Sequence, residues 1–306
     1  MTTPGIPNEF AFSTSGFGAR LANIQDQVFA AVGMGFRRLE LGLTDSPPSM
    51  DGLEEARRET GVTMVSMVVG CRDTMGRDLP AAKLASLDDA ERNRAMSSLR
   101  RHARLATGWG CRRLIVRGSS VEDPALRAEA RALEARALQN GVSPELREEV
   151  GRYVERVQAA GQPQLQVLCR SLHEVMTEHP LLEFAIEPGL YIDDLLGFDA
   201  VGWVLDDLRS KGIGYWHDVG RIHLREKQGL PAHEKWLERF ASRMVGVHLQ
   251  DAADTETAMP VGVGEVDFAM LREYVPANAE RVLELHPRHG RAEILASIRM
   301  LLDRSF

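Results

Sequence analysis

The sequence has few cysteines and no long hydrophobic run, and each of these absences excludes a class of protein. The 306 residues include three cysteines. Cys71, Cys111 and Cys169 follow no paired spacing, so neither a disulfide framework nor a zinc ribbon is expected. No stretch approaches the roughly 18 apolar residues that a membrane span requires. The N-terminal MTTPGIPNEF also lacks the basic and apolar regions of a signal peptide. We therefore expect a cytoplasmic protein that does not enter a membrane.

The chain also contains fewer basic residues than acidic ones. Lys and Arg total 37 against 44 Asp and Glu, a formal net charge of −7, so the chain as a whole does not attract phosphate backbones. The expected partner is a small molecule and not a nucleic acid. With 44% hydrophobic and 26% charged residues, the composition is that of an ordinary globular protein. No linker interrupts it, so residues 1–306 are expected to form a single domain.

Short apolar runs alternate with longer amphipathic ones, which is typical of parallel strands joined by helices. Eight such runs predict an α/β protein, and eight units fit a closed (β/α)8 or TIM barrel better than an open, doubly wound sheet. The expected strands are 9–14, 37–41, 63–69, 113–117, 182–187, 214–218, 244–249 and 281–285. The expected helices include 24–32, 53–60, 88–107, 197–209, 233–240, 268–274 and 291–303.

One interval, between the fourth and fifth expected strands, is too long for a simple repeat. It contains the helix-forming run DPALRAEARALEARALQN. Asp123-Pro124 is typical of a helix start and Asn140-Gly141 of a helix stop. We predict an inserted helix around residues 121–140, followed by the regular fourth barrel helix. Because it leaves a carboxyl-end loop, it can cover the barrel mouth as a lid, meet another subunit of a homo-oligomer, or simply face solvent.

Four potential metal ligands end apolar runs in the C-terminal half of the chain. They are Glu187 in LEFAIEP, Asp218 in IGYWHD, His248 in MVGVHLQD and Glu284 in RVLELHP. Each ending alone is also compatible with a helix cap or a structural residue. The carboxyl ends of parallel barrel strands meet at one mouth, so all four are expected to converge there. Three carboxylates and one imidazole suit a divalent cation, Mn²⁺ or Mg²⁺ above all, without excluding Co²⁺ or Zn²⁺.

These segments resemble the xylose isomerase-like barrel superfamily, particularly its sugar-phosphate isomerase and epimerase branch. GIGYWHDVG is similar to the family's sixth-strand Asp segment, VGVHLQDA to its seventh-strand His segment, and PVGVGEVDF to its Pro-x-Gly-x-Gly-x-x-Asp-Phe segment. The resemblance implies that Glu187, Asp218, His248 and Glu284 ligate a metal, with Asp251 as a partner behind the ligands. It further implies that Glu187 and Glu284 exchange protons with a sugar or sugar phosphate next to a metal-bound carbonyl. The implied activity is isomerisation or epimerisation in carbohydrate metabolism.

Two positions depart from the family pattern. Many relatives carry a His three residues after the sixth-strand Asp, where this chain has Arg221, and many carry His or Lys where it has Gln250. A guanidinium stays protonated at ordinary pH, so Arg221 can be neither a neutral base nor a second metal ligand. It can bind a carboxylate or a phosphate with two parallel hydrogen bonds.

Four residues near the expected mouth are candidate substrate contacts: Glu40, Arg117, Arg221 and His286. His286 shares strand parity with Glu284 and so faces the same side if the strand continues. Glu40, at the end of the second strand, could instead cap a helix or form a salt bridge. Arg117, at the end of the fourth strand, could instead pair with a neighbouring carboxylate.

Three other functions are compatible with the same residues. A metal-dependent lyase or dehydratase would form an enolate and then lose a substituent, and Arg117 and Arg221 would suit an acidic substrate for it. An apurinic-site endonuclease shares the fold but uses additional metal ligands, and Arg221 and the net negative charge argue against it. A non-catalytic binding barrel is the third, and it is distinguished by whether the protein holds metal.

Overall fold

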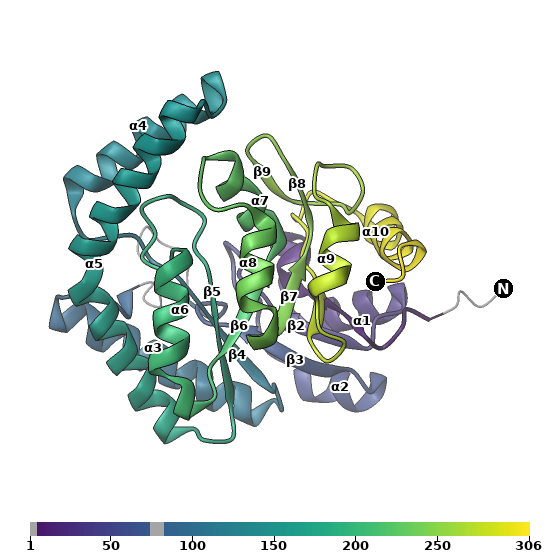
Figure 1. Ribbon diagram of the computed structural model, residues 1–306. Coiled ribbons are helices and arrows are strands. Elements are labelled where there is room, and N and C mark those ends of the chain that lie inside the picture. The colour runs from purple at the N-terminus through teal and green to yellow at the C-terminus, as the bar shows by residue number, and fades with distance from the viewer. Residues whose placement is uncertain (1–4, 74–82) are drawn as a thin grey trace.

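The computed structural model describes residues 5–73 and 83–306. The N-terminal stretch considered above therefore lies partly outside the described residues. Eight parallel strands close into a barrel in the order β1-β10-β7-β6-β5-β4-β3-β2, and helices surround it (Figure 1). The strands are β1 (Phe10–Ser13), β2 (Arg38–Leu41), β3 (Thr63–Val68), β4 (Arg113–Arg117), β5 (Glu183–Glu187), β6 (Gly214–Asp218), β7 (Met244–Leu249) and β10 (Glu280–Leu283). The predicted (β/α)8 barrel is confirmed.

The helices that follow the strands match the predicted ranges to within a few residues. They are α1 (Ile24–Met34), α2 (Leu53–Thr60), α3 (Asp89–Gly108), α6 (Phe198–Asp207), α8 (His233–Phe240), α9 (Phe268–Tyr274) and α10 (Arg291–Asp303). In the part of the chain that the structure describes, the short 3-10 helices η1 (Thr14–Arg20), η3 (Arg209–Lys211) and η4 (Ala241–Arg243) lie in the connections. Among the helices that the structure describes, none has both the length and the apolar character needed to cross a membrane.

Two elements at the carboxyl ends of the strands were not predicted. Helix α7 (Val219–Lys227) begins directly after β6, and Asp218 caps it by accepting a hydrogen bond from the Arg221 N–H. A hairpin of β8 (Asp251–Ala253) and β9 (Glu256–Met259) follows β7. Both elements lie at the end of the barrel where the candidate ligands were expected, and so both contribute to its rim (Figure 1).

Two helices fill the long interval between β4 and β5. They are α4 (Pro124–Asn140) and α5 (Pro144–Glu178). Asp123 caps α4 by accepting hydrogen bonds from two backbone N–H groups. The hydroxyl of Tyr153 in α5 donates to the Leu126 carbonyl oxygen of α4 at 3.0 Å, which ties the two helices together. In Figure 1, α4 projects from the upper left of the barrel, at the same end as α7 and the β8–β9 hairpin.

Buried side chains pack together inside the barrel, among them Val68, Ile115 and Trp216. Trp216 is the largest of them and is completely buried. Gly246 on the neighbouring strand makes room for it, because a Cβ there would lie 2.1 Å from the Trp216 ring. The Trp216 ring lies 5.1 Å from the His248 ring, centroid to centroid. The packed interior therefore forms a floor directly beneath His248.

Candidate metal centre

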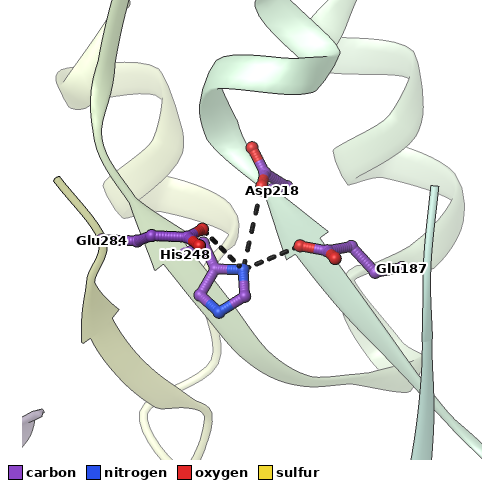
Figure 2. A group of neighbouring side chains, drawn as sticks. All are labelled: Glu187, Asp218, His248 and Glu284. Carbon is purple, nitrogen blue, oxygen red and sulfur yellow. Dashed lines mark hydrogen bonds and ion pairs between the residues drawn. The ribbon is translucent and has the colours of Figure 1, made fainter. Parts of the chain in front are cut away.

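The strand register brings the candidate ligands together. Arg117 on β4 is paired in register with Glu187 on β5, and Asp218 on β6 is paired with His248 on β7. Glu284 directly follows β10, the strand that pairs with β7 on its other side. Neighbours in register on parallel strands point to the same face, so these side chains share the barrel mouth. Figure 2 shows the three carboxylates converging on the imidazole of His248.

The four candidate ligands form one compact, buried cluster. One ligand atom from each lies within 4.8 Å of the others. His248 Nδ1 is 2.7 Å from a Glu187 oxygen, 3.3 Å from a Glu284 oxygen and 3.8 Å from an Asp218 oxygen. Ligand atoms about 2.1–2.2 Å from one ion lie at most roughly 4.4 Å apart. A small inward shift of the side chains is therefore enough for these donors to fit a divalent ion.

Glu40 lies behind His248, on the side of the ring that faces away from the cluster. Both oxygens of its carboxylate are 3.0 Å from His248 Nε2, and the Ser66 hydroxyl donates to it at 2.8 Å. Glu40 is completely buried. An Nε2–H that donates to Glu40 leaves the lone pair on Nδ1, the nitrogen that faces the three carboxylates. For Glu40, this position favours a role in holding the His248 ring in place over a role in contacting a substrate.

Two arginines bind the carboxylates of the cluster. The Arg117 Nε donates to Glu187, and its Nη2 lies 3.2 and 3.4 Å from the two oxygens of Glu284. Arg117 thus joins two candidate ligands from different strands of the barrel, and pairing with a carboxylate is the role that the sequence left open for it. The Arg221 Nε donates to Asp218 at 3.1 Å. Both arginine side chains are largely buried, being 15% and 20% exposed.

Burial and charge act in opposite directions on the carboxyl groups of the cluster. Burial alone would raise the pKa of Glu187 and of Glu284, but the positive charges of Arg117 and His248 outweigh it and hold both pKa values below their ordinary range. For Asp218 burial prevails, and its pKa lies above the ordinary value. Glu187 and Glu284 are therefore held as carboxylates, the form that can accept a proton.

His248 shows the reverse balance. Burial alone would lower the pKa of its imidazole, but the charges of Glu40, Glu284 and Glu187 outweigh burial and raise the pKa well above its ordinary value. Before an ion binds, the ring is therefore an imidazolium near neutral pH. An ion that coordinates Nδ1 must displace that proton.

Gln250, which the sequence marked only as a departure from the family pattern, contacts the cluster although it was not among the predicted site residues. Its Nε2 donates to Asp218 at 3.0 Å, and its Oε1 accepts a hydrogen bond from the Ala258 N–H in β9. Gln250 thus connects a candidate ligand to the β8–β9 hairpin. The available signal was its spacing of two residues from His248, which gives both side chains the same strand parity.

In the part of the chain that the structure describes, the side chains of Asp251 and His286 bond to loop residues and not to the four candidate ligands. The Asp251 carboxylate accepts hydrogen bonds from the N–H groups of Ala252, Gly262 and Val266 at 2.9, 2.8 and 3.1 Å. These bonds favour a role for Asp251 in holding the PVGVGEV loop over a role in positioning a candidate metal ligand. His286 is exposed at the rim, where its Nδ1 accepts from the Arg288 N–H at 3.1 Å. Its contact with a substrate stays a prediction.

A cleft of about 910 Å³ lies between α4, α7, α8 and the hairpin. Its lining includes Leu138 of α4, Tyr191 of the β5–α6 loop and His223 of α7. None of the four candidate ligands lines it. Helix α4 therefore forms one wall of a cleft that is separate from the cluster.

No protein-family model and no curated protein sequence matches this chain. Solved structures do match it over nearly their whole length. The 3-keto-D-glucoside 4-epimerase YcjR from E. coli matches with a TM-score of 0.65 and 16% identity, covering 97% of this chain and 100% of that protein. The D-allulose 3-epimerase from Methylomonas sp., solved with D-allulose, matches with a TM-score of 0.60 and 13% identity over 99% of each chain.

A third matching structure contains a metal ion. A xylose isomerase-like TIM barrel protein from Mycobacterium smegmatis, solved with magnesium, matches with a TM-score of 0.55 and 13% identity, covering 96% of this chain and 95% of that one. At such identities the likeness shows the fold alone. The chain has a xylose isomerase-like barrel, as the resemblance of its sequence implied.

Proposed function

We propose that this protein is a divalent-metal-dependent isomerase or epimerase that moves a proton next to the carbonyl of a sugar or sugar derivative. The observation that carries the proposal is the buried cluster of three carboxylates and one imidazole at the mouth of the barrel. Proteins with this fold include epimerases of a ketoglucoside and of D-allulose, which supports sugar chemistry. Another holds magnesium, which supports a metal.

Glu187, Asp218, His248 and Glu284 would hold the ion. When bound, a divalent cation polarises a carbonyl and stabilises the negative charge that develops on its oxygen. Asp218 is fixed through both of its oxygens by Arg221 and Gln250, so its contribution is to hold the metal in place. His248 has the same role, because Glu40 fixes its ring.

Glu187 and Glu284 would transfer the proton. They reach the mouth from β5 and from the end of β10, which are separated in the barrel by β6 and β7. Their carboxylates therefore approach a bound substrate from different sides. Arg117 holds both groups as carboxylates, so each is ready to act as a base. General-base catalysis of this kind typically accelerates a reaction by about 10²- to 10⁴-fold.

Deuterium exchange tests the proposal. Metal-loaded protein incubated with a panel of ketoses in D₂O should place deuterium on a carbon next to the carbonyl of its substrate, as detected by NMR. Glu187→Gln keeps the shape and one oxygen donor while removing the base, so exchange should fall by at least about 10²-fold. The matched control is Glu183→Gln at the other end of β5, where Glu183 pairs with Arg112 and Arg113. It should exchange normally.

Metal content must be measured in each variant, because Glu187 is also a proposed ligand. Undiminished exchange in Glu187→Gln would refute proton transfer by this residue. A metal-dependent lyase or dehydratase is the second candidate, favoured by the guanidinium groups of Arg117 and Arg221 beside the cluster. Exchange accompanied by loss of water from the substrate would assign the lyase reaction instead.

A further inference from the structure

The guanidinium of Arg221 is only partly used by the protein. Its Nε and its backbone N–H bind the two oxygens of Asp218. None of the hydrogen bonds found among the described residues involves its Nη1 or Nη2. The side chain is 20% exposed, and its Nη atoms are not among the buried polar atoms that lack a partner. The outer edge of a largely buried guanidinium therefore opens to solvent at the mouth.

The guanidinium of Arg221 lies next to the cluster that contains the proposed proton-transfer groups. Its Nε donates to Asp218 at 3.1 Å, and Asp218, Glu187 and Glu284 each offer an oxygen atom within 4.8 Å of the others. Arg117 contacts Glu187 and Glu284 directly. Two fixed positive charges therefore act on the space between Glu187 and Glu284, where a substrate would be bound.

The charges of the metal-loaded cluster would sum to zero, so the cluster would not repel an additional anion. Four buried carboxylates surround His248: Glu40, Glu187, Asp218 and Glu284. A divalent ion together with Arg117 and Arg221 balances their four negative charges, with a neutral imidazole as ligand. Without the two arginines the loaded site would be doubly negative, and it would repel both an anionic substrate and the charge formed when a proton is removed.

We propose that Arg221 selects a substrate that carries an anionic group, a carboxylate or a phosphate, and binds that group through its Nη1 and Nη2. The planar guanidinium presents two parallel N–H donors that match either group. This inference rests on the proposed function, because it names the substrate class of the same site. A neutral ketose would leave these two donors facing only water.

Binding of unreactive analogues to the metal-loaded protein tests the proposal. D-Erythronate, erythritol 4-phosphate and erythritol share a hydroxylated four-carbon chain and differ in having a terminal carboxylate, a terminal phosphate or no charge. By calorimetry, at least one charged analogue should bind about tenfold or more tightly than erythritol, and the tighter of the two identifies the group. Arg221→Gln should weaken its binding by about 10- to 100-fold, as expected for a lost hydrogen-bonded charge pair. Erythritol binding should change by less than about twofold.

Arg221→Lys and Lys227→Gln complete the design. Arg221→Lys keeps the positive charge but not the two parallel N–H donors, so it should weaken binding of the charged analogue less than Arg221→Gln does. If the Gln variant loses metal, the Lys variant is used for the test instead. Lys227 lies on the same helix, but its ammonium is paired with Glu265 at 2.6 Å. Lys227→Gln should therefore leave the affinity for all three analogues unchanged.

Two results would overturn the role of Arg221. One is equal affinity of the wild-type protein for the charged and neutral analogues. The other is an anion affinity that Arg221→Gln does not reduce, which would mean that the metal alone binds the anion. Metal content separates these outcomes from failure of the proposed function. A wild-type protein that holds no metal contradicts the proposed function, whereas a metal-loaded protein with no preference for anions contradicts this inference alone.

Discussion

Glu40 offers a test of how the cluster is held together. Its carboxylate is completely buried and lies 3.0 Å from His248 Nε2. Ser66, also completely buried, donates to it at 2.8 Å. If Glu40 fixes the ring so that Nδ1 faces the metal, its removal should weaken metal binding although Glu40 itself is not a ligand. Supporting residues of this kind typically change metal affinity by about 10- to 100-fold, or roughly 1.4–2.7 kcal/mol.

Two substitutions separate the charge of Glu40 from its hydrogen bond. Glu40→Gln keeps an oxygen that can accept from His248 Nε2, so it should weaken metal binding by about tenfold, the lower end of that range. Glu40→Leu removes both charge and acceptor, so it should approach about 100-fold. Glu293→Gln is a matched control, because Glu293 also binds a histidine, His289, at 2.7 Å but lies on α10 and is exposed. It should leave metal affinity unchanged.

Competition with a chromophoric chelator gives the dissociation constant of Mn²⁺ or Co²⁺ for each variant. The measurement belongs at a pH where the wild-type protein binds one equivalent of metal. A dissociation constant for Glu40→Leu equal to that of the wild type would refute the reasoning, since the orientation of His248 would then not depend on Glu40. A larger loss in Glu40→Gln than in Glu40→Leu would also contradict it, because the Gln variant retains the acceptor.

Four individual residues give further predictions. Because the pKa of His248 lies well above its ordinary value, metal binding near neutral pH should release one proton and weaken about tenfold per unit fall in pH, as calorimetry in buffers of different ionisation enthalpy would show. Burial lowers the pKa of His102 to about 4, so its stabilising effect is complete above pH 6.5 and is lost as pH falls toward 4. The difference in unfolding free energy between wild type and His102→Leu should shrink by about 3 kcal/mol over that range, and no change would contradict a buried neutral ring. Gly246→Ala should destabilise the fold by about 1–3 kcal/mol or more, because its Cβ would meet Trp216 at 2.1 Å. Gly33→Ala, in helix α1 with nothing within 4 Å, should stabilise it by roughly 0.5–1 kcal/mol, and urea titration of both glycine variants would measure these changes.

The barrel was predictable because its strands are short apolar runs that stop at polar residues. The predicted ends at Glu187, Asp218 and Leu249 are those of β5, β6 and β7. Helix α7 was missed because it starts directly after β6, with Asp218 serving both as strand end and as helix cap. The β8–β9 hairpin was missed because its turn contains no glycine: Asp254 adopts the left-handed conformation there, with a φ of 53°.

The contacts between side chains across the mouth could not be predicted from the sequence, for a different reason. Strand parity predicts which residues face the mouth, and it brought the four candidate ligands to one place. It does not predict which mouth residue contacts which, because that depends on the stagger between strands far apart in the sequence. Glu40 and His248 are 208 residues apart, and Arg117 and Glu284 are 167 residues apart.

The contrast between the candidate ligands and the arginines explains why a candidate metal site was easier to predict than a substrate contact. A metal ligand needs only to bring an oxygen or nitrogen atom to the mouth, because an ion there would bind the carboxylates and imidazoles within its reach. A substrate contact depends on the direction in which one side chain points. Arg221 lies on α7, a helix that was not predicted, and two of its donors are already taken by Asp218. Only the structure reveals that its Nη1 and Nη2 have no hydrogen-bond partner among the described residues and are not sealed from solvent, and those two donors make an anionic substrate a testable expectation.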